Sequence, residues 1–316
     1  MRLKLFNRHR RHKFRVYRYT GRHRRTEAEK RIIDFLAAAV VIALMLITLN
    51  SLIGKSEKRT EISPKDLAAF RIPAGTITDL SDLAVKYNID YSELLTVYSM
   101  DNGFFSQKSE VMTNVSAIEA KYILNYSDIK RNFSGKEYHE YFSMMASVFA
   151  EVRCFPIPAG YNEADYMYGD SYGVSRNYGN ETIHVGTDIL DRENIRGRME
   201  VLSMTDGTVF NSGWGDRSGY YVGIKTVSGN YYFYAHLSEI AKDVKNGDYV
   251  SAGQNIGRMG DTGYSKEPGT TGNFPVHLHV EISPKTSIAK DLALNPYPVL
   301  RYIEYQEREA RNVLEN

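Results

Sequence analysis

The stretch that most constrains the fold lies near the end of the chain, at residues 274–282, and reads FPVHLHVEI. Apolar and β-favouring residues surround its two histidines, His277 and His279, so the stretch predicts a β-strand. Because alternate residues of a strand point to the same face, both imidazoles are expected to reach one site. Two adjacent imidazoles among apolar neighbours are costly to bury unless a site uses them. A chance pair on a solvated face is the competing interpretation.

A second polar pair upstream favours the interpretation as a site. Residues 184–190 read HVGTDIL, which offers one more imidazole and a carboxylate in a β-like context. His184, Asp188 and one of the two later histidines together supply three nitrogen or oxygen ligands of the type that zinc prefers. Three protein ligands with an open fourth position are typical of a catalytic zinc site, whereas structural sites are closed.

The order of these motifs resembles the M23 family of zinc endopeptidases, of the lysostaphin/LytM type. The resemblance covers residues 155–300, about half of the chain. Between the two ligand motifs it includes DGTV (206–209), GWG (213–215), YAHL (234–237), NGD (246–248), GQNIG (253–257) and GDTG (260–263). Several ordered motifs are far more specific than one short pattern. The resemblance implies a mainly β fold, a compact antiparallel sheet with a metal in a groove across it.

Matched residue by residue, the resemblance implies a Zn²⁺ site and its accessory groups. The implied metal ligands are His184, Asp188 and His279. His277, on the same strand face as His279, is expected beside the metal without ligating it. His236, in the YAHL motif, matches the family's second catalytic histidine.

The chemistry of such a site makes this division of roles sensible. Zinc with three protein ligands lowers the pKa of its bound water to about 7, which provides a nucleophile at neutral pH. A histidine can take or give a proton near that pH, and a second histidine or a phenol can donate a hydrogen bond to the developing oxyanion. Which of His236 and His277 does which is left open. Tyr178 stands where some family members carry an oxyanion-stabilising tyrosine, but in a chain with 24 tyrosines a core or surface role is equally plausible.

Two segments depart from the family pattern. The link between the GDTG motif and His277, residues 264–276, is longer than usual, and residues 192–198 are long and charged. Both flank the expected groove. They therefore concern substrate preference and leave the ligand set intact.

The N-terminal part of the chain is strongly basic and then strongly apolar. Residues 1–31 hold 13 Lys or Arg and two acids, a local charge of +11, so the rest of the chain carries −9 of the net +2. Residues 32–53 are long and apolar enough for one membrane-spanning helix, and basic flanks stay cytoplasmic. A signal peptide is the competing interpretation, but the basic segment is very long and no cleavage site follows. We expect a single-pass membrane anchor with its N-terminus in the cytoplasm and the remainder extracellular, which argues against a nucleic-acid partner for the arm.

The exported part divides into a helical region and the peptidase-like domain. Residues 54–152 are expected to form a stalk and helices, weakly LysM-like at 70–102, followed by the M23-like domain at 153–303 and a tail at 304–316. Cys154 is the only cysteine, so an intramolecular disulfide is impossible and stability depends on the core or the metal. The His139–Glu140 pair does not match a zinc helix of the type His-Glu-x-x-His, because Ser143 replaces the second histidine.

The sequence therefore predicts a membrane-anchored, extracellular zinc endopeptidase. The implied substrate is the peptide part of bacterial peptidoglycan. A non-catalytic scaffold that binds the wall or a partner protein, as in sporulation channel proteins, is the alternative. The presence of all matched ligands and both accessory histidines favours the enzyme. Partner proteins and the cross-link that is cut stay open.

Overall fold

The structure, a computed structural model, describes residues 63–102, 114–133, 135–177, 181–272 and 274–315. The basic arm at 1–31 and the predicted membrane span at 32–53 lie outside these ranges. Within them, no helix has both the length and the apolar character that a bilayer crossing needs.

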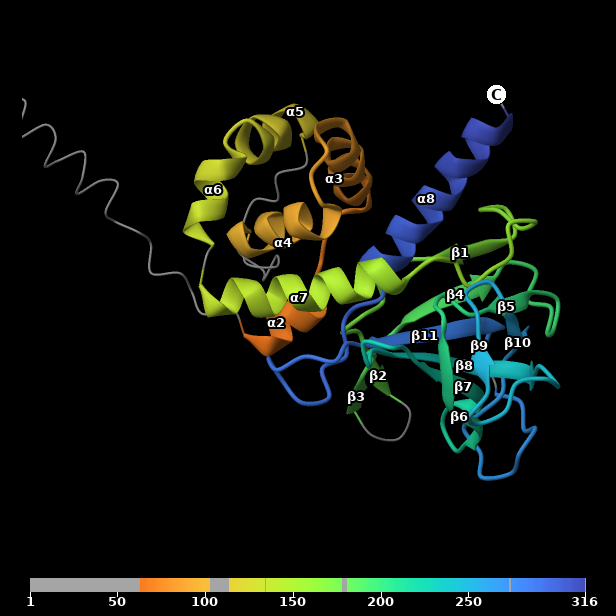
Figure 1. Cartoon of the computed structure of the whole chain (residues 1–316). Coiled ribbons are helices and arrows are strands. Elements are labelled where there is room, and N and C mark those ends of the chain that lie inside the picture. The colour runs from red at the N-terminus through yellow and green to blue at the C-terminus, as the bar shows by residue number, and fades with distance from the viewer. Residues whose placement is uncertain (1–62, 103–113, 134, 178–180, 273, 316) are drawn as a thin grey trace, which may run out of the picture. The chain divides into compact units, whose positions relative to one another are not determined.

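Helices form the first part of the described chain (Figure 1). Side-chain caps start three of them. Ser63 accepts a hydrogen bond from the backbone N–H of Asp66 at 3.1 Å, Asp90 accepts one from that of Glu93 at 2.9 Å, and Asn114 accepts one from that of Ala117 at 3.0 Å. The described residues of the weakly LysM-like segment, 70–102, contain helices and no strand. The elements are α2 (Pro64–Ala69), α3 (Ala74–Tyr87), α4 (Tyr91–Asp101), α5 (Val115–Ile118), the π-helical turn η2 (Glu119–Ile123), α6 (Tyr126–Asn132) and α7 (Lys136–Glu151).

A mainly antiparallel sheet follows, as the sequence predicted. Its hydrogen-bonded order is β1-β4-β11-β8-β7-β6-β9, with β10 paired to both β5 and β8, while β2 and β3 form a separate hairpin. The strands are β1 (Tyr166–Tyr168), β2 (Ser175–Asn177), β3 (Glu181–Ile183), β4 (Thr187–Asp191), β5 (Glu200–Leu202), β6 (Gly207–Gly215), β7 (Gly219–Lys225), β8 (Tyr231–Ile240), β9 (Tyr249–Val250), β10 (Asn255–Met259) and β11 (His277–Ser283).

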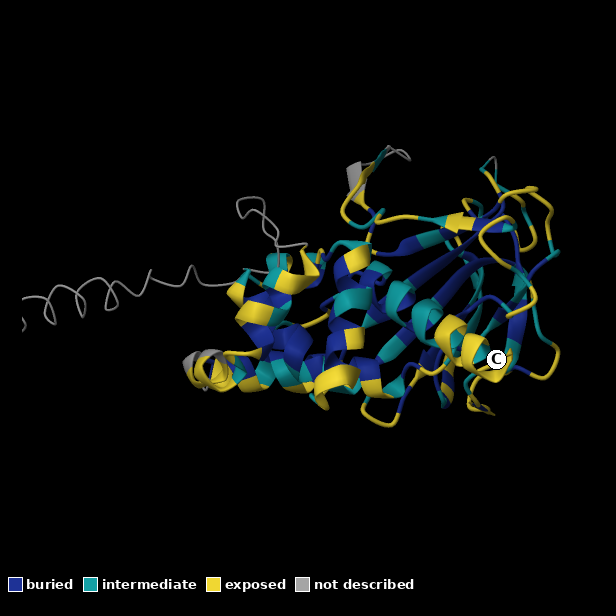
Figure 2. Ribbon diagram, turned by 90° about the horizontal axis from the view of Figure 1, so that it is seen from above, coloured by how far each residue is buried: buried dark blue, intermediate teal, exposed yellow. Residues whose placement is uncertain are grey.

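The two faces of the sheet differ because strand residues alternate in direction. On β11, the side chains of Leu278, Val280 and Ile282 are fully buried and belong to the hydrophobic core. The alternate residues, among them His277 and His279, lie on the opposite face. Figure 2 shows the buried residues continuing from the helices into the strands, and they form one core cluster.

A long helix, α8 (Tyr297–Glu315), contacts both the helical part and the sheet. Glu304 accepts hydrogen bonds from the hydroxyls of Tyr166 and Tyr168 on β1, each at 2.6 Å. One residue further along α8, the Tyr305 hydroxyl donates to Asp82 of α3 at 2.7 Å. The predicted boundary between domain and tail at 303/304 therefore falls inside a continuous helix, and the residues that follow it, Glu304 and Tyr305, contact both parts.

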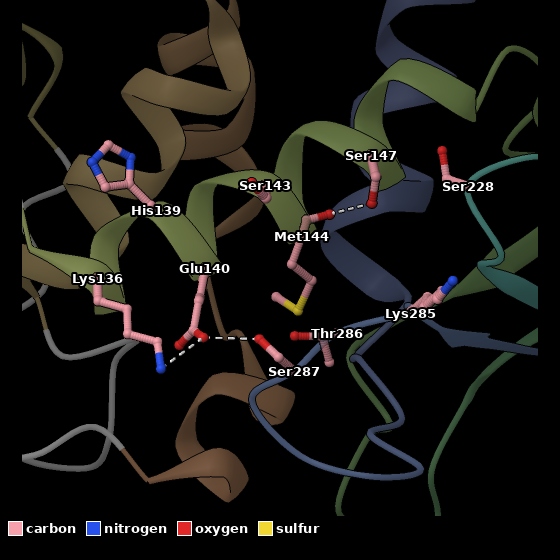
Figure 3. A pocket seen from close by; sticks show the side chains of 10 residues that line it. All are labelled: Lys136, His139, Glu140, Ser143, Met144, Ser147, Ser228, Lys285, Thr286 and Ser287. Atoms are coloured by element: carbon pink, nitrogen blue, oxygen red, sulfur yellow. Dashed lines mark hydrogen bonds and ion pairs between the residues drawn. The ribbon is translucent and has the colours of Figure 1, made fainter.

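A polar cleft of about 420 Å³ lies where α7 meets the loop after β11 (Figure 3). Glu140 of α7 crosses the junction by accepting a hydrogen bond from Ser287 at 2.9 Å. Deeper in the junction, Asn230 donates to Glu151 at 2.7 Å. His139 lines this cleft, but none of the histidines predicted for the metal site does. The cleft is therefore separate from the predicted chemistry.

Candidate metal centre

The register of two antiparallel strands brings the predicted ligands together. His279 on β11 lies directly opposite Asp188 on β4, so both side chains point to the same face. His184 enters from the turn between β3 and β4. Gly186 in that turn makes a close approach possible, because a Cβ there would lie 2.5 Å from His279 Cε1. A larger residue at 186 would push the two histidines apart.

Three ligand atoms converge in this arrangement. His279 Nδ1 lies 2.9 Å from Asp188 Oδ1 and 3.0 Å from His184 Nε2, and His184 Nε2 lies 3.1 Å from Asp188 Oδ1. Among the described residues, these three form the group whose ligand atoms lie close enough together to hold a metal ion. Two imidazole nitrogens and one carboxylate oxygen suit zinc, so the residues present fit the ion that the sequence predicts.

Hydrogen bonds behind the ligands fix the nitrogens that face the site. His184 Nδ1–H donates to the backbone carbonyl of Ser171 at 2.8 Å, which leaves Nε2 with the lone pair. The other nitrogen of His279 is fixed in the same way, because Nε2–H donates to Glu281 Oε1 at 2.9 Å. Such partners orient metal-ligating histidines and increase their basicity. Glu281 is a functional residue that the sequence reasoning missed, although the i, i+2 spacing from His279 could have indicated it.

His279 lies between two carboxyl groups, those of Asp188 and Glu281. Burial would lower the pKa of His279, but hydrogen bonds to Asp188 and Glu281 outweigh it and raise that pKa to about 9. Burial would likewise raise the pKa of Asp188, whereas its hydrogen bonds with His184 and His279 hold that pKa well below the usual range. Asp188 is therefore an ionised ligand, and His279 must release a proton before Nδ1 can bind a metal.

His236 reaches the site because its backbone breaks the strand alternation. Its φ of 60° is in the left-handed region, which is uncommon for a residue other than glycine and is often found at functional sites. The ring then lies 4.8 Å from that of His277, centroid to centroid. His236 Nδ1–H donates to the backbone carbonyl of Thr262 at 2.8 Å, so Nε2 carries the lone pair.

His277 presents an unpartnered nitrogen. Its Nδ1–H donates to the backbone carbonyl of Pro275 at 2.7 Å, and its buried Nε2 has no hydrogen-bond partner. That Nε2 lies 3.9 Å from Asp188 Oδ1, beside the ligand cluster and outside it. Burial lowers the pKa of His277, and burial with the neighbouring histidines lowers that of His236 to about 3. Both rings are therefore neutral acceptors at neutral pH.

Comparison with known proteins identifies this arrangement. Residues 182–295 match the model of peptidase family M23, a span that contains every ligand and both accessory histidines. A solved structure from Ruminococcus gnavus, of a candidate glycyl-glycine endopeptidase lytM, is 32% identical with a TM-score of 0.60. That match covers 77% of this chain and 92% of the other. The chain belongs to peptidase family M23.

Two further bacterial proteins are similar to parts of this M23 chain. The L-Ala–D-Glu endopeptidase of Bacillus subtilis (strain 168) is 34% identical over 176 residues, which are 55% of this chain and 51% of the relative. Lysostaphin of Staphylococcus staphylolyticus is 34% identical over 143 residues, 45% of this chain and 27% of the relative. The chain therefore spans about half of the first relative and about a quarter of the second. The endopeptidases among these relatives are hydrolases that act on peptide bonds.

The M23 domain contains further site residues that the sequence did not reveal. Arg176 on β2 forms an ion pair with Asp188 Oδ2, which leaves Oδ1 facing the two histidines. Phe274, from the long link at 264–276, packs its ring 4.9 Å from that of His236 and 5.1 Å from that of His277. The link was expected to flank the groove, but its direct contact with the accessory histidines was not predicted. Tyr178 lies outside the described residues.

Proposed function

We propose that this M23 chain is a zinc-dependent endopeptidase that hydrolyses amide bonds in the peptide part of peptidoglycan. The relatives named L-Ala–D-Glu endopeptidase and lysostaphin support the reaction class. The observation that carries the proposal is the unpartnered, buried Nε2 of His277 beside three converging ligand atoms. A buried polar atom without a partner is costly, so its presence next to a metal site indicates a group that acts on substrate.

The residues of the chain divide the work by their hydrogen bonds. Zinc held by His184, Asp188 and His279 would supply Lewis acidity and would lower the pKa of a water molecule, so that it loses a proton and becomes a nucleophile at neutral pH. His236 and His277 both carry a lone pair on Nε2, because backbone carbonyls hold the Nδ1 protons. Either ring can accept the proton of the attacking water, and the protonated ring can then donate to the oxyanion or to the leaving amine. Glu281 and Arg176 hold the ligands in place.

The proposed location is the outer face of the cytoplasmic membrane. It rests on the basic arm at 1–31 and the apolar run at 32–53, which together favour a helix inserted with its N-terminus inside. A protease added to intact protoplasts should then remove most of the chain. Protection until the cells are lysed would contradict this orientation.

The test of the activity uses the His277→Ala variant of the zinc-loaded full chain and purified sacculi. We expect it to retain zinc and to release muropeptides about a hundredfold more slowly or worse, the effect of losing a positioned acid or base. His139→Ala is the matched control, since it removes an exposed histidine of α7 that does not belong to the metal centre. That control should behave as the unmodified chain.

A scaffold would give a different result. Equal release by His277→Ala and His139→Ala would contradict the role of His277. If neither the unmodified chain nor the variant releases a new amine terminus from several cross-link types, the peptidase proposal is wrong. The non-catalytic scaffold on an M23 fold would then be the better account.

A further inference from the structure

The sheet face that carries the metal centre continues beyond it as a row of aromatic side chains. Phe233 on β8 lies opposite Glu281 of β11, and Tyr231 lies opposite Ser283. Because directly opposed residues of an antiparallel pair share a face, both rings lie on the face of His279. The row is thus continuous with the metal centre through Glu281, which hydrogen-bonds His279.

Tyr231 extends across its neighbouring strand. Its hydroxyl donates to Asn211 Oδ1 on β6 at 2.8 Å, two strands away from its own backbone on β8. The strand between them carries Gly223 at the crossing point, where an added Cβ would overlap both the Tyr231 hydroxyl and Asn211 Oδ1. The ring therefore lies along the sheet above a glycine, with one face toward the backbone and the other directed outward.

Two further rings extend this surface. The rings of Tyr231 and Phe233 are 6.2 Å apart and inclined by 28°, and those of Phe233 and Tyr221 are 5.3 Å apart and inclined by 37°. Phe210 stands at 82° to Tyr231 at the far end and is 61% exposed. We call Tyr221, Tyr231, Phe233 and Phe210 the aromatic platform. Its first three members are half-buried, so part of each ring remains accessible.

We propose that the aromatic platform binds sugar rings of the glycan strand whose attached peptide is cut at the metal centre. This inference rests on the proposed function. A pyranose has an apolar C–H face and a rim of hydroxyls, which match flat ring faces bordered by polar groups. The border here is formed by the amide of Asn211, the hydroxyl of Tyr231 and Ser283. The ammonium group of Lys225 lies 5.2 Å from the centroid of the Phe210 ring.

Distances along the sheet limit where the sugar is attached. Phe233 is a diagonal neighbour of His279, about 7–8 Å away, and Tyr231 is about 7 Å further along the strand. An extended peptide spans about 3.3–3.6 Å per residue. The platform therefore suits a sugar attached roughly two to four residues from the cut bond, and it favours cleavage near the glycan end of a peptide.

The test compares two substrates with the zinc-loaded full chain. One is a muropeptide that carries its disaccharide, and the other is the same peptide with the disaccharide removed. Phe210→Ala and Phe233→Leu should each lower kcat/KM for the first substrate about three- to tenfold, as expected for losing one aromatic contact. The sugar-free peptide should be cut at an unchanged rate. Tyr87→Ala, which removes a 37% exposed ring of α3, is the matched control and should change neither substrate.

A binding measurement separates this inference from the proposed function. An N-acetylglucosamine tetramer should bind the unmodified chain in calorimetric titration and bind Phe210→Ala several-fold more weakly. If the chain cuts neither substrate, the proposed function fails, and the tetramer still decides whether the platform binds sugar. Equal losses on both substrates, or tetramer binding that Phe210→Ala leaves unchanged, would overturn the inference.

Discussion

The proton on His279 should compete with zinc for the same nitrogen. The pKa of His279 is raised to about 9, since Asp188 and Glu281 accept hydrogen bonds from its two nitrogens. Below that pH, the lone pair of Nδ1 holds a proton, and zinc binding must release it. The apparent zinc affinity should therefore increase with pH up to about 9 and then level off.

The size of the effect follows from that pKa. A pH of 7 is two units below the pKa of His279. Proton competition therefore weakens zinc binding at pH 7 by about a hundredfold, or about 3 kcal/mol at 1.36 kcal/mol per unit. Competition with a zinc-binding chromophore of known pH dependence, between pH 6 and 10, measures the slope. Calorimetry in two buffers of different ionisation enthalpy counts the released proton.

Replacing Glu281 by Gln separates its two effects. The amide still accepts a hydrogen bond from His279 Nε2–H, but the charge that helps to raise the pKa is gone. At pH 9 the variant should bind zinc about ten- to a hundredfold more weakly, the usual loss when such a supporting carboxylate is removed. The difference in zinc affinity between the variant and the unmodified chain should become smaller toward pH 7. Without the charge of Glu281, His279 binds its proton less tightly, so the proton competes less with zinc. Glu239→Gln, at a 66% exposed carboxylate, is the control.

Two results would refute this reasoning. One is a zinc affinity that does not change between pH 7 and 9 in the unmodified chain. The other is a constant ratio between the affinities of the unmodified chain and Glu281→Gln over that range. Either would mean that the His279 proton does not occupy the ligand position.

Three further outcomes are expected. Asp188→Ala should lose zinc in elemental analysis, whereas His236→Ala should largely retain it, because His236 is not among the converging ligands; equal loss would contradict the division of roles. The pKa of His236 is lowered to about 3. The free energy of unfolding should therefore fall as pH drops from 6.5 toward 3, by up to about 1.4 kcal/mol per pH unit, because only the unfolded chain can protonate this ring. In urea unfolding at pH 7 and pH 4, that free energy should decrease less for His236→Gln than for the unmodified chain. Gly223→Ala should lower the free energy of unfolding by about 1–3 kcal/mol through overlap with the Tyr231 hydroxyl, and adding Tyr231→Phe should recover part of it in the same assay.

The sheet and the meeting of the two polar motifs could be predicted because both depend on short-range patterns, whereas the choice of His279 over His277 as a ligand came from the family resemblance. The alternation in residues 274–282 places His277 and His279 on one face whatever the strand's neighbours are. A buried opposite face then fixes the register, since a slip of one residue would exchange the two faces. The register observed, His279 opposite Asp188, is what the paired motifs need in order to meet.

The supporting residues could not be predicted, because their partners are distant in sequence or depend on backbone conformation. Tyr305 and Glu307 look like solvated helix residues, yet they contact Asp82 and the backbone N–H of Phe155. His236 sits in the middle of an apparent strand, where alternation alone gives no indication of a left-handed φ. Arg176 reaches Asp188 because β2 and β3 form a hairpin, which the sequence pattern did not indicate.

The surroundings of the metal centre show why His279 is charged whereas His236 and His277 are neutral. Asp188 is ionised and forms an ion pair with Arg176, and Glu281 accepts a hydrogen bond from His279. Hydrogen bonds to Asp188 and Glu281 hold the proton of His279 between two acceptors. Zinc replaces that proton and adds one net positive charge. His236 and His277 stay uncharged through burial, which avoids repulsion from the metal and keeps their lone pairs available to accept the proton of an attacking water. The proton on His279 therefore occupies the position of the metal cation, and metal binding must release it.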